Sequence, residues 1–213
     1  MATILLSSAD EGAPGSGTVL VIGKSELALT GSVELIRANG RIAGATNDFD
    51  NVTRLFDAGR IDVVVFGGMV PPSRKESLRE IMARLNPAIV FVQGLAGIPG
   101  LIAEQVEATL GPVARPGLDV TYDPHARQAV MTLDAEEHVR VVAFWHTAFV
   151  PPDPSSTSRV IFDDALPAGS HRVGVPDDVP TVASFLVVHL GESVYPFVVG
   201  PMPEGLAPAA PTT

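Results

Sequence analysis

The chain has 213 residues, of which 46% are hydrophobic and 18% charged, a composition that supports a packed core and excludes a disordered chain. The formal net charge is −10, with 9 basic and 12 acidic residues before position 113 and 5 and 12 from there on. Because neither half carries the basic footprint that nucleic acid or an anionic membrane surface requires, we expect neither as a partner.

The start of the chain lacks the features of a signal peptide. Residues 1–17 contain no basic segment and only one short apolar run, Ile4–Leu6, so we expect a flexible leader. No apolar run approaches the ~20 residues needed to cross a bilayer. There is no cysteine, which excludes disulfides, thiolate catalysis and cysteine metal sites. These features predict a cytoplasmic protein.

Strands and helices are predicted to alternate from residue 18 to residue 112. Short apolar runs predict strands at 18–22, 41–46, 61–66 and 88–92. Apolar residues at helical spacing predict helices at 25–39, 48–58, 73–85 and 98–110. The third helix has the clearest start, since Ser73 and Glu76 have the spacing of a capping box. Four such units predict a small parallel sheet with helices, Rossmann-like or flavodoxin-like in strand order.

Helical periodicity ends after residue 112, and residues 113–117 are predicted to be a linker. Seven short apolar runs separated by turn signals then predict strands at 118–122, 128–133, 138–149, 159–162, 171–175, 182–190 and 194–199. They predict an all-β second half, an immunoglobulin/fibronectin-like β-sandwich over residues 118–201. Trp145 matches the usual core tryptophan of such sandwiches in kind. The Pro- and Ala-rich residues 202–213 predict a disordered tail.

The candidate binding residues follow the predicted parallel strands, because open sheets of this kind bind ligands outside the carboxyl ends of their strands. Asp48 lies near the end of the second strand, close to where dinucleotide-binding domains place a ribose-binding acid. The predicted cofactor-binding residues are Gly23, Lys24, Asp48, Gly67, Gly68 and Gly94. The hypothesis is a small ligand such as a nucleotide or NAD(P). The alternative is that these glycines only form short turns between strands and helices.

Two phosphate-handling motifs are excluded. Gly23-Lys24-Ser25 has the ending of a P-loop, but the glycine required five positions before Gly23 is Thr18, inside a predicted strand. The alternation is also similar to that of receiver domains. Such domains need acids after the first strand and a phosphoacceptor aspartate after the third, where this chain has Gly23-Lys24 and Gly67-Gly68.

Histidines and acid pairs offer little for metal binding. His138 and His146 face the same side of one predicted strand, but eight residues separate them by about 26 Å, too far to share an ion. We therefore expect no metal site and predict satisfied or solvent-facing histidines. The acid pairs Glu136-Glu137, Asp163-Asp164 and Asp177-Asp178 fall in predicted turns, where a loop calcium site is a minor alternative.

Three hypotheses follow from these residues. In the first, the α/β half binds a small molecule and the β half covers the crevice or mediates association. In the second, the protein is a non-catalytic structural or interaction protein with a degenerate cofactor domain, and the sandwich forms a homodimer or binds a partner, with Phe144-Trp145 and Val182–Leu190 as core or interface. In the third, it is an enzyme of unfamiliar class that uses Lys24, Glu26, Asp48, Arg74 and Lys75 at the crevice.

Overall fold

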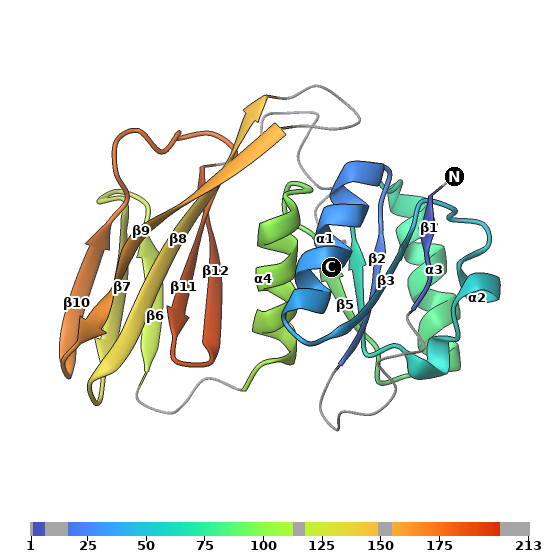
Figure 1. The fold of residues 1–213 in the computed structure, drawn as a ribbon, viewed down its shortest axis with the longest axis horizontal. Coiled ribbons are helices and arrows are strands. Elements are labelled where there is room, and N and C mark those ends of the chain that lie inside the picture. Colours follow the sequence, from blue (N-terminus) through green and yellow to red (C-terminus); the bar gives the residue numbers. More distant parts are fainter. Residues whose placement is uncertain (1, 7–16, 113–117, 149–154, 201–213) are drawn as a thin grey trace.

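The computed structural model describes residues 2–6, 17–112, 118–148 and 155–200, and it combines an α/β half with a β half (Figure 1). The predicted linker 113–117 and tail 202–213 lie outside the described residues, as does most of the predicted leader. None of the helices in the described part of the chain is long and apolar enough to cross a membrane.

A five-stranded sheet in the order β1-β3-β2-β4-β5 forms the centre of the α/β half. Four of its strands are parallel: β2 (Thr18–Ile22), β3 (Ile42–Thr46), β4 (Val63–Phe66) and β5 (Val90–Gln93). The sequence predicted all four within two residues, because each contains a short run of buried apolar side chains. The first parallel strand, β2, lies between the second and the third.

The fifth strand, β1 (Thr3–Ile4), was not predicted and lies inside the range 1–17 assigned to a flexible leader. It pairs antiparallel with β3, with Thr3 opposite Thr46. Ile4 packs against the cluster beneath α1, and Leu6 packs on the opposite face of the sheet. The leader prediction is therefore wrong for these first residues, which form an edge of the sheet.

Helices cover both faces of this sheet. One face carries α1 (Glu26–Ala38) and α4 (Pro99–Leu110), and the other carries α2 (Val52–Leu55) and α3 (Pro72–Leu85). Alternate residues of β2 accordingly enter different cores: Val19 and Val21 pack toward α1 and α4, Leu20 and Ile22 toward α2 and α3. The second predicted helix, 48–58, is shorter than expected: α2 has 4 residues, and a separate 3₁₀ turn at Ala58–Arg60 follows it.

The β half is a sandwich of two antiparallel sheets, β10-β7-β6 and β12-β11-β8-β9. Met131, Val141 and Leu186 are among the fully buried side chains between the two sheets, and Trp145 packs against this cluster partly buried. The seven strands are β6 (Asp119–Asp123), β7 (Gln128–Leu133), β8 (Glu137–Ala148), β9 (Ser155–Leu166), β10 (Gly169–Gly174), β11 (Ser184–Leu190) and β12 (Ser193–Gly200). Six are close to the predicted runs, but β9 has 12 residues where only 159–162 was predicted. The turn prediction for Asp163-Asp164 is wrong, because both lie within β9, paired with β8.

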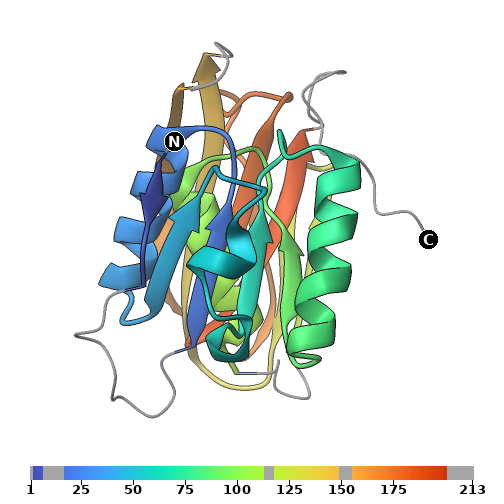
Figure 2. The same cartoon turned by 90° about the vertical axis from the view of Figure 1, so that its right-hand side faces the viewer.

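The four-stranded sheet is buried on its second face by α4, which lies between the two halves (Figures 1 and 2). Val142 and Phe144 of β8, with Phe185 and Val187 of β11, pack there against Ile98 and Leu101. The approach is close: a Cβ on Gly100 of α4 would lie 2.9 Å from the Phe144 ring. The apolar strands considered for a partner interface thus bury part of their surface within the chain.

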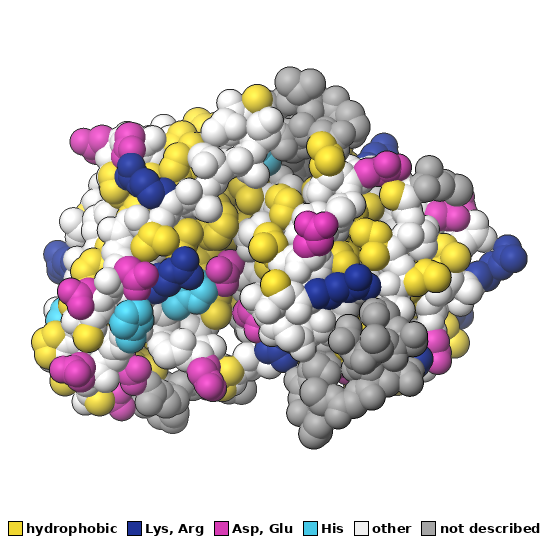
Figure 3. Space-filling model, viewed as in Figure 1, with side chains coloured by type: hydrophobic (Ala, Val, Ile, Leu, Met, Phe, Trp, Pro, Cys, Tyr) yellow, Lys and Arg dark blue, Asp and Glu magenta, His cyan; other side chains and the backbone are white. Residues whose placement is uncertain are grey.

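The face of the molecule seen in Figure 3 carries basic and acidic side chains interspersed over both halves. On the sandwich, Asp163 contacts both His138 and Arg140.

Candidate functional site

The loops that follow β2, β3, β4 and β5 meet at one edge of the sheet. These loops, residues 23–26, 47–51, 67–71 and 93–98, together with the first turn of α3, residues 72–75, are here called the carboxyl edge. Three predicted glycines lie next to one another there and extend the strand pairing by one residue. The amide of Gly67 donates to Ile22 (2.8 Å) and that of Gly94 to Phe66 (2.8 Å), while Gly23 donates to Thr46 (3.2 Å). The parallel sheet thus brings together residues that are up to 71 positions apart.

The chain's own packing accounts for two of these glycines. A Cβ on Gly67 would lie 3.3 Å from the Cα of Gly23, and a Cβ on Gly94 would lie 3.2 Å from the carbonyl oxygen of Phe66. Gly68 is different, because nothing lies within 4 Å of its Cβ position. Among the four predicted glycines, Gly68 alone has open space at its Cβ position, where a ligand would have room. Lys24, also predicted, is exposed.

Asp48, the predicted ribose-binding acid, is 9% exposed. It directly follows the loop residue Asn47 at the end of β3, and its backbone amide donates to the Thr46 hydroxyl (3.0 Å). The side-chain amide of Asn51 donates to its carboxylate (2.8 Å). Its recorded side-chain partner is therefore a neutral amide rather than a cation.

Lys75, near the start of α3, is only 6% exposed and was not among the predicted binding residues. Its Nζ donates to Oε1 of Gln93 (2.8 Å), and the Gln93 amide donates in turn to the carbonyl oxygen of Phe66 (2.9 Å). Burial, and secondly the nearby charge of Arg79, lower the pKa of Lys75. The sequence did contain a signal, since Lys75 is three and seven residues before Leu78 and Met82 and so lies on the buried stripe of the helix.

Asp48 and Lys75 share a property found nowhere else in the described residues. Among these residues, Asp48 is the only buried carboxylate and Lys75 the only buried ammonium group, and both lie at the carboxyl edge. Neither is ion-paired with another described residue. Burying an unpaired charge is costly, and such groups concentrate at functional sites.

The chain matches no protein-family model and no curated protein.

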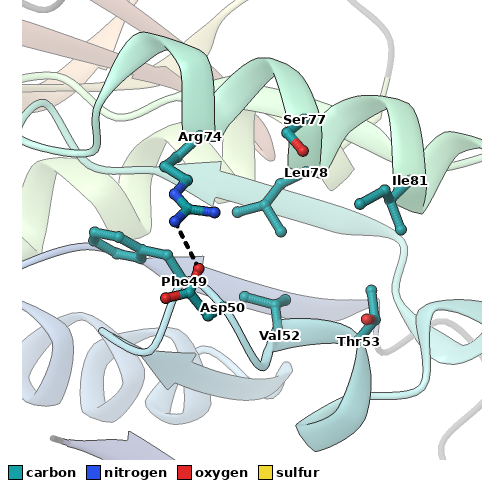
Figure 4. Close-up of a pocket in the computed structure, with 8 residues that line it drawn as sticks. All are labelled: Phe49, Asp50, Val52, Thr53, Arg74, Ser77, Leu78 and Ile81. Carbon is teal, nitrogen blue, oxygen red and sulfur yellow. Dashed lines mark ion pairs between the residues drawn. The ribbon is translucent and has the colours of Figure 1, made fainter.

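A small hollow of about 100 Å³ lies beside this edge, between the segment after β3 and α3 (Figure 4). Arg74 pairs with Asp50 across it (2.8 Å), and both side chains are more than half exposed. Ligand pockets usually measure about 300–1,000 Å³. This hollow is therefore large enough for only a small part of a ligand.

A larger hollow of about 400 Å³ lies at the far end of α4, where the last helical turn meets the start of β12. Glu107 lines it but already pairs with Arg41 (2.8 Å). The pair raises the pKa of Arg41, chiefly through their hydrogen bond. None of the predicted binding residues lies there.

Two histidines of the sandwich contact the α/β half. Nε2 of His146 in β8 lies 2.8 Å from the carbonyl oxygen of Ala96, in the loop after β5, and Nδ1 lies 3.3 Å from that of Ser155. His189 of β11 faces Glu104 of α4 at 3.3 Å. His138 instead contacts Asp163 (3.2 Å), so His138 and His146 have separate surroundings. Among the described residues, no three acids or histidines are grouped as metal ligands would be.

Proposed function

We propose that this protein binds a small polar molecule, with a nucleotide as the best candidate, at the carboxyl edge of its parallel sheet. The observation that carries the proposal is the burial of Asp48 and Lys75, the only buried acid and amine of the described residues, at this one edge. Ligands of doubly wound sheets bind outside the carboxyl ends of the strands, where the connections diverge to the two faces. Here that point lies between β2 and β4, at Gly23 and Gly67.

The two buried charges limit the shape of such a ligand. Asp48 follows β3 and Lys75 lies beside β5, so the three strand spacings from β3 to β5 separate them by about 14 Å. A ligand that contacts both must be elongated. The carboxylate of Asp48 accepts hydrogen bonds only, which suits the hydroxyl groups of a sugar.

A thermal-shift screen with nucleotides and NAD(P) tests the proposal. We expect a ligand that raises the Tm and a loss of roughly tenfold in its affinity in Asp48→Asn, because the amide is a weaker acceptor than the carboxylate. Asp50→Asn is the matched control, since Asp50 is exposed and paired with Arg74. If no nucleotide or dinucleotide shifts the Tm, the nucleotide proposal is wrong.

We also infer a specific fold type for each half of the chain. We infer a flavodoxin-like sheet, supported by the position of β2 between β3 and β4. We infer a fibronectin-type sandwich, supported by its seven strands in sheets of three and four.

A second candidate function is association through the sandwich, as a homodimer. It is favoured by β9, a twelve-residue strand whose only recorded partner is β8 and whose Val160 is 42% exposed. Sedimentation at high concentration tests it, and a strictly monomeric mass would contradict it.

A further inference from the structure

The chain contains two lysines, Lys24 and Lys75, and both lie at the carboxyl edge. Lys24 is exposed in the loop after β2. Lys75 is buried in the first turn of α3, beside the ends of β4 and β5. The two amines thus differ in burial.

The hydrogen bonding of Lys75 is incomplete. An ammonium group has three donors, and the recorded acceptor among the described residues is Oε1 of Gln93. Gln93 is fixed in that role, because its amide nitrogen donates to the carbonyl oxygens of Phe66 (2.9 Å) and Gly94 (3.2 Å). The site therefore holds the amine in place without neutralising it.

The surroundings of Lys75 add positive charge. Arg79, one turn further along α3, lies with its guanidinium 5.5 Å from the centre of the Phe66 ring, and its Nε is buried without an acceptor in the described structure. The first turn of α3 carries no acid, although a helix N-terminus favours one. No carboxylate of the described residues is paired with Lys75 or Arg79. The positive charges of Lys75 and Arg79 therefore favour an incoming anion.

We propose that Lys75 binds a phosphate group of the ligand at the carboxyl edge. The inference rests on the proposed function, which places the ligand there. It assigns one end of that ligand: the phosphate lies beside β4 and β5, next to the open backbone at Gly68, and the hydroxyl-bearing part extends toward Asp48. An anion at Nζ offsets the burial that lowers the pKa of Lys75 and supplies an acceptor for its remaining donors.

Inorganic phosphate is the first probe, because it requires no assumption about the rest of the ligand. We compare the Tm in millimolar phosphate and in chloride at equal ionic strength for the wild-type protein, Lys75→Met and the control Arg84→Met, which removes an exposed charge at the opposite end of α3. Methionine keeps most of the length of the lysine side chain and removes the buried charge, so Lys75→Met is expected to fold. Phosphate should raise the Tm of the wild type and of Arg84→Met but not of Lys75→Met. An equal rise in all three proteins, or none in the wild type, would overturn the inference.

Nucleoside monophosphates and the corresponding nucleosides distinguish this inference from the proposed function. For a nucleotide that binds, removal of the phosphate should weaken binding at least tenfold, and Lys75→Met should abolish that difference. Asp48→Asn should weaken nucleotide and nucleoside alike. If both bind equally and Lys75→Met has no effect, the inference is wrong while the proposed function stands. If phosphate stabilises the protein through Lys75 but no nucleotide or nucleoside binds, the inference stands and the proposal of a nucleotide ligand is wrong.

Discussion

Asp48 and Lys75 illustrate how far single residues could be assigned from the sequence. Asp48 was predicted because its distance from Gly23 fits a strand–helix–strand unit, a local property of the chain. Lys75 was considered only for the enzyme hypothesis, because nothing near it in sequence reveals its contact with Gln93, 18 positions away. Its burial depends on β5 lying beside β4 and beneath α3, which is a tertiary relation.

The buried amine of Lys75 makes the stability of the protein depend on pH. Because its pKa in the folded state lies below the usual 10.5, the unfolded chain binds the proton more readily between these two values. The free energy of unfolding contributed by this group therefore rises with pH in that range. Lys75→Met lacks this dependence, and without ligand its Tm should exceed that of the wild type near neutral pH by an amount that shrinks toward pH 10.5.

Thermal unfolding of both proteins in chloride buffers across the alkaline range measures this difference. Lys24→Met serves as control and should follow the wild type, since Lys24 is exposed. A Tm difference that is constant from neutral to alkaline pH would contradict a buried, desolvated amine at position 75.

Among the helices, the sequence indicated the extents better than the caps. The predicted capping box of α3 is wrong: the helix begins at Pro72, and the residue before it, Pro71, makes no side-chain cap. Proline is favoured at the first helical position because its missing N–H is not needed there, so it takes the place expected of Ser73. In α1 the side chain of Ser25 does accept from the amide of Ala28 (3.0 Å).

This difference predicts unequal effects for two similar substitutions. Ser25→Ala should lower the free energy of unfolding by about 1 kcal/mol, because it removes a cap. Ser73→Ala should change it by less than about 0.5 kcal/mol, because Ser73 is exposed inside the first turn. Chemical denaturation of both variants checks this pair, and equal losses would show that Ser73 caps α3 after all.

Strand β1 was missed for a reason specific to edges. It has only two residues, and its pairing is with β3, about 40 positions away. The long central strands contain enough apolar residues to be detected alone. A short edge strand forms only through its pairing with a neighbouring strand, and its own sequence does not reveal that pairing.

For the whole molecule, the decisive feature is the packing of the sandwich on α4. Phe144, Phe185 and Val187 form a core with Leu101 that spans both halves. Such a shared core should couple their unfolding. The protein has one tryptophan, Trp145, in the sandwich, and its α-helices lie in the α/β half, so each half has its own spectroscopic signal.

We expect tryptophan fluorescence and helical circular dichroism to report the same denaturation midpoint. Phe144→Ala should lower stability by about 3–5 kcal/mol by opening a cavity at the junction. Val198→Ala, at an exposed position of β12, is the control and should change stability by no more than about 0.5 kcal/mol. Two separate transitions in the wild type would contradict a shared core.

The sequence predicted most strands and helices of this protein, because hydrophobic periodicity and turn residues are local patterns that extend over a few positions. It indicated four strand–helix units, seven later strands and the boundary between them near residue 112. Tertiary contacts set the strand order, the position of α4 between the halves and the placement of Asp48 and Lys75 at the same edge of the sheet. These features depend on contacts between segments that are far apart in the sequence, and no local sequence pattern encodes such contacts.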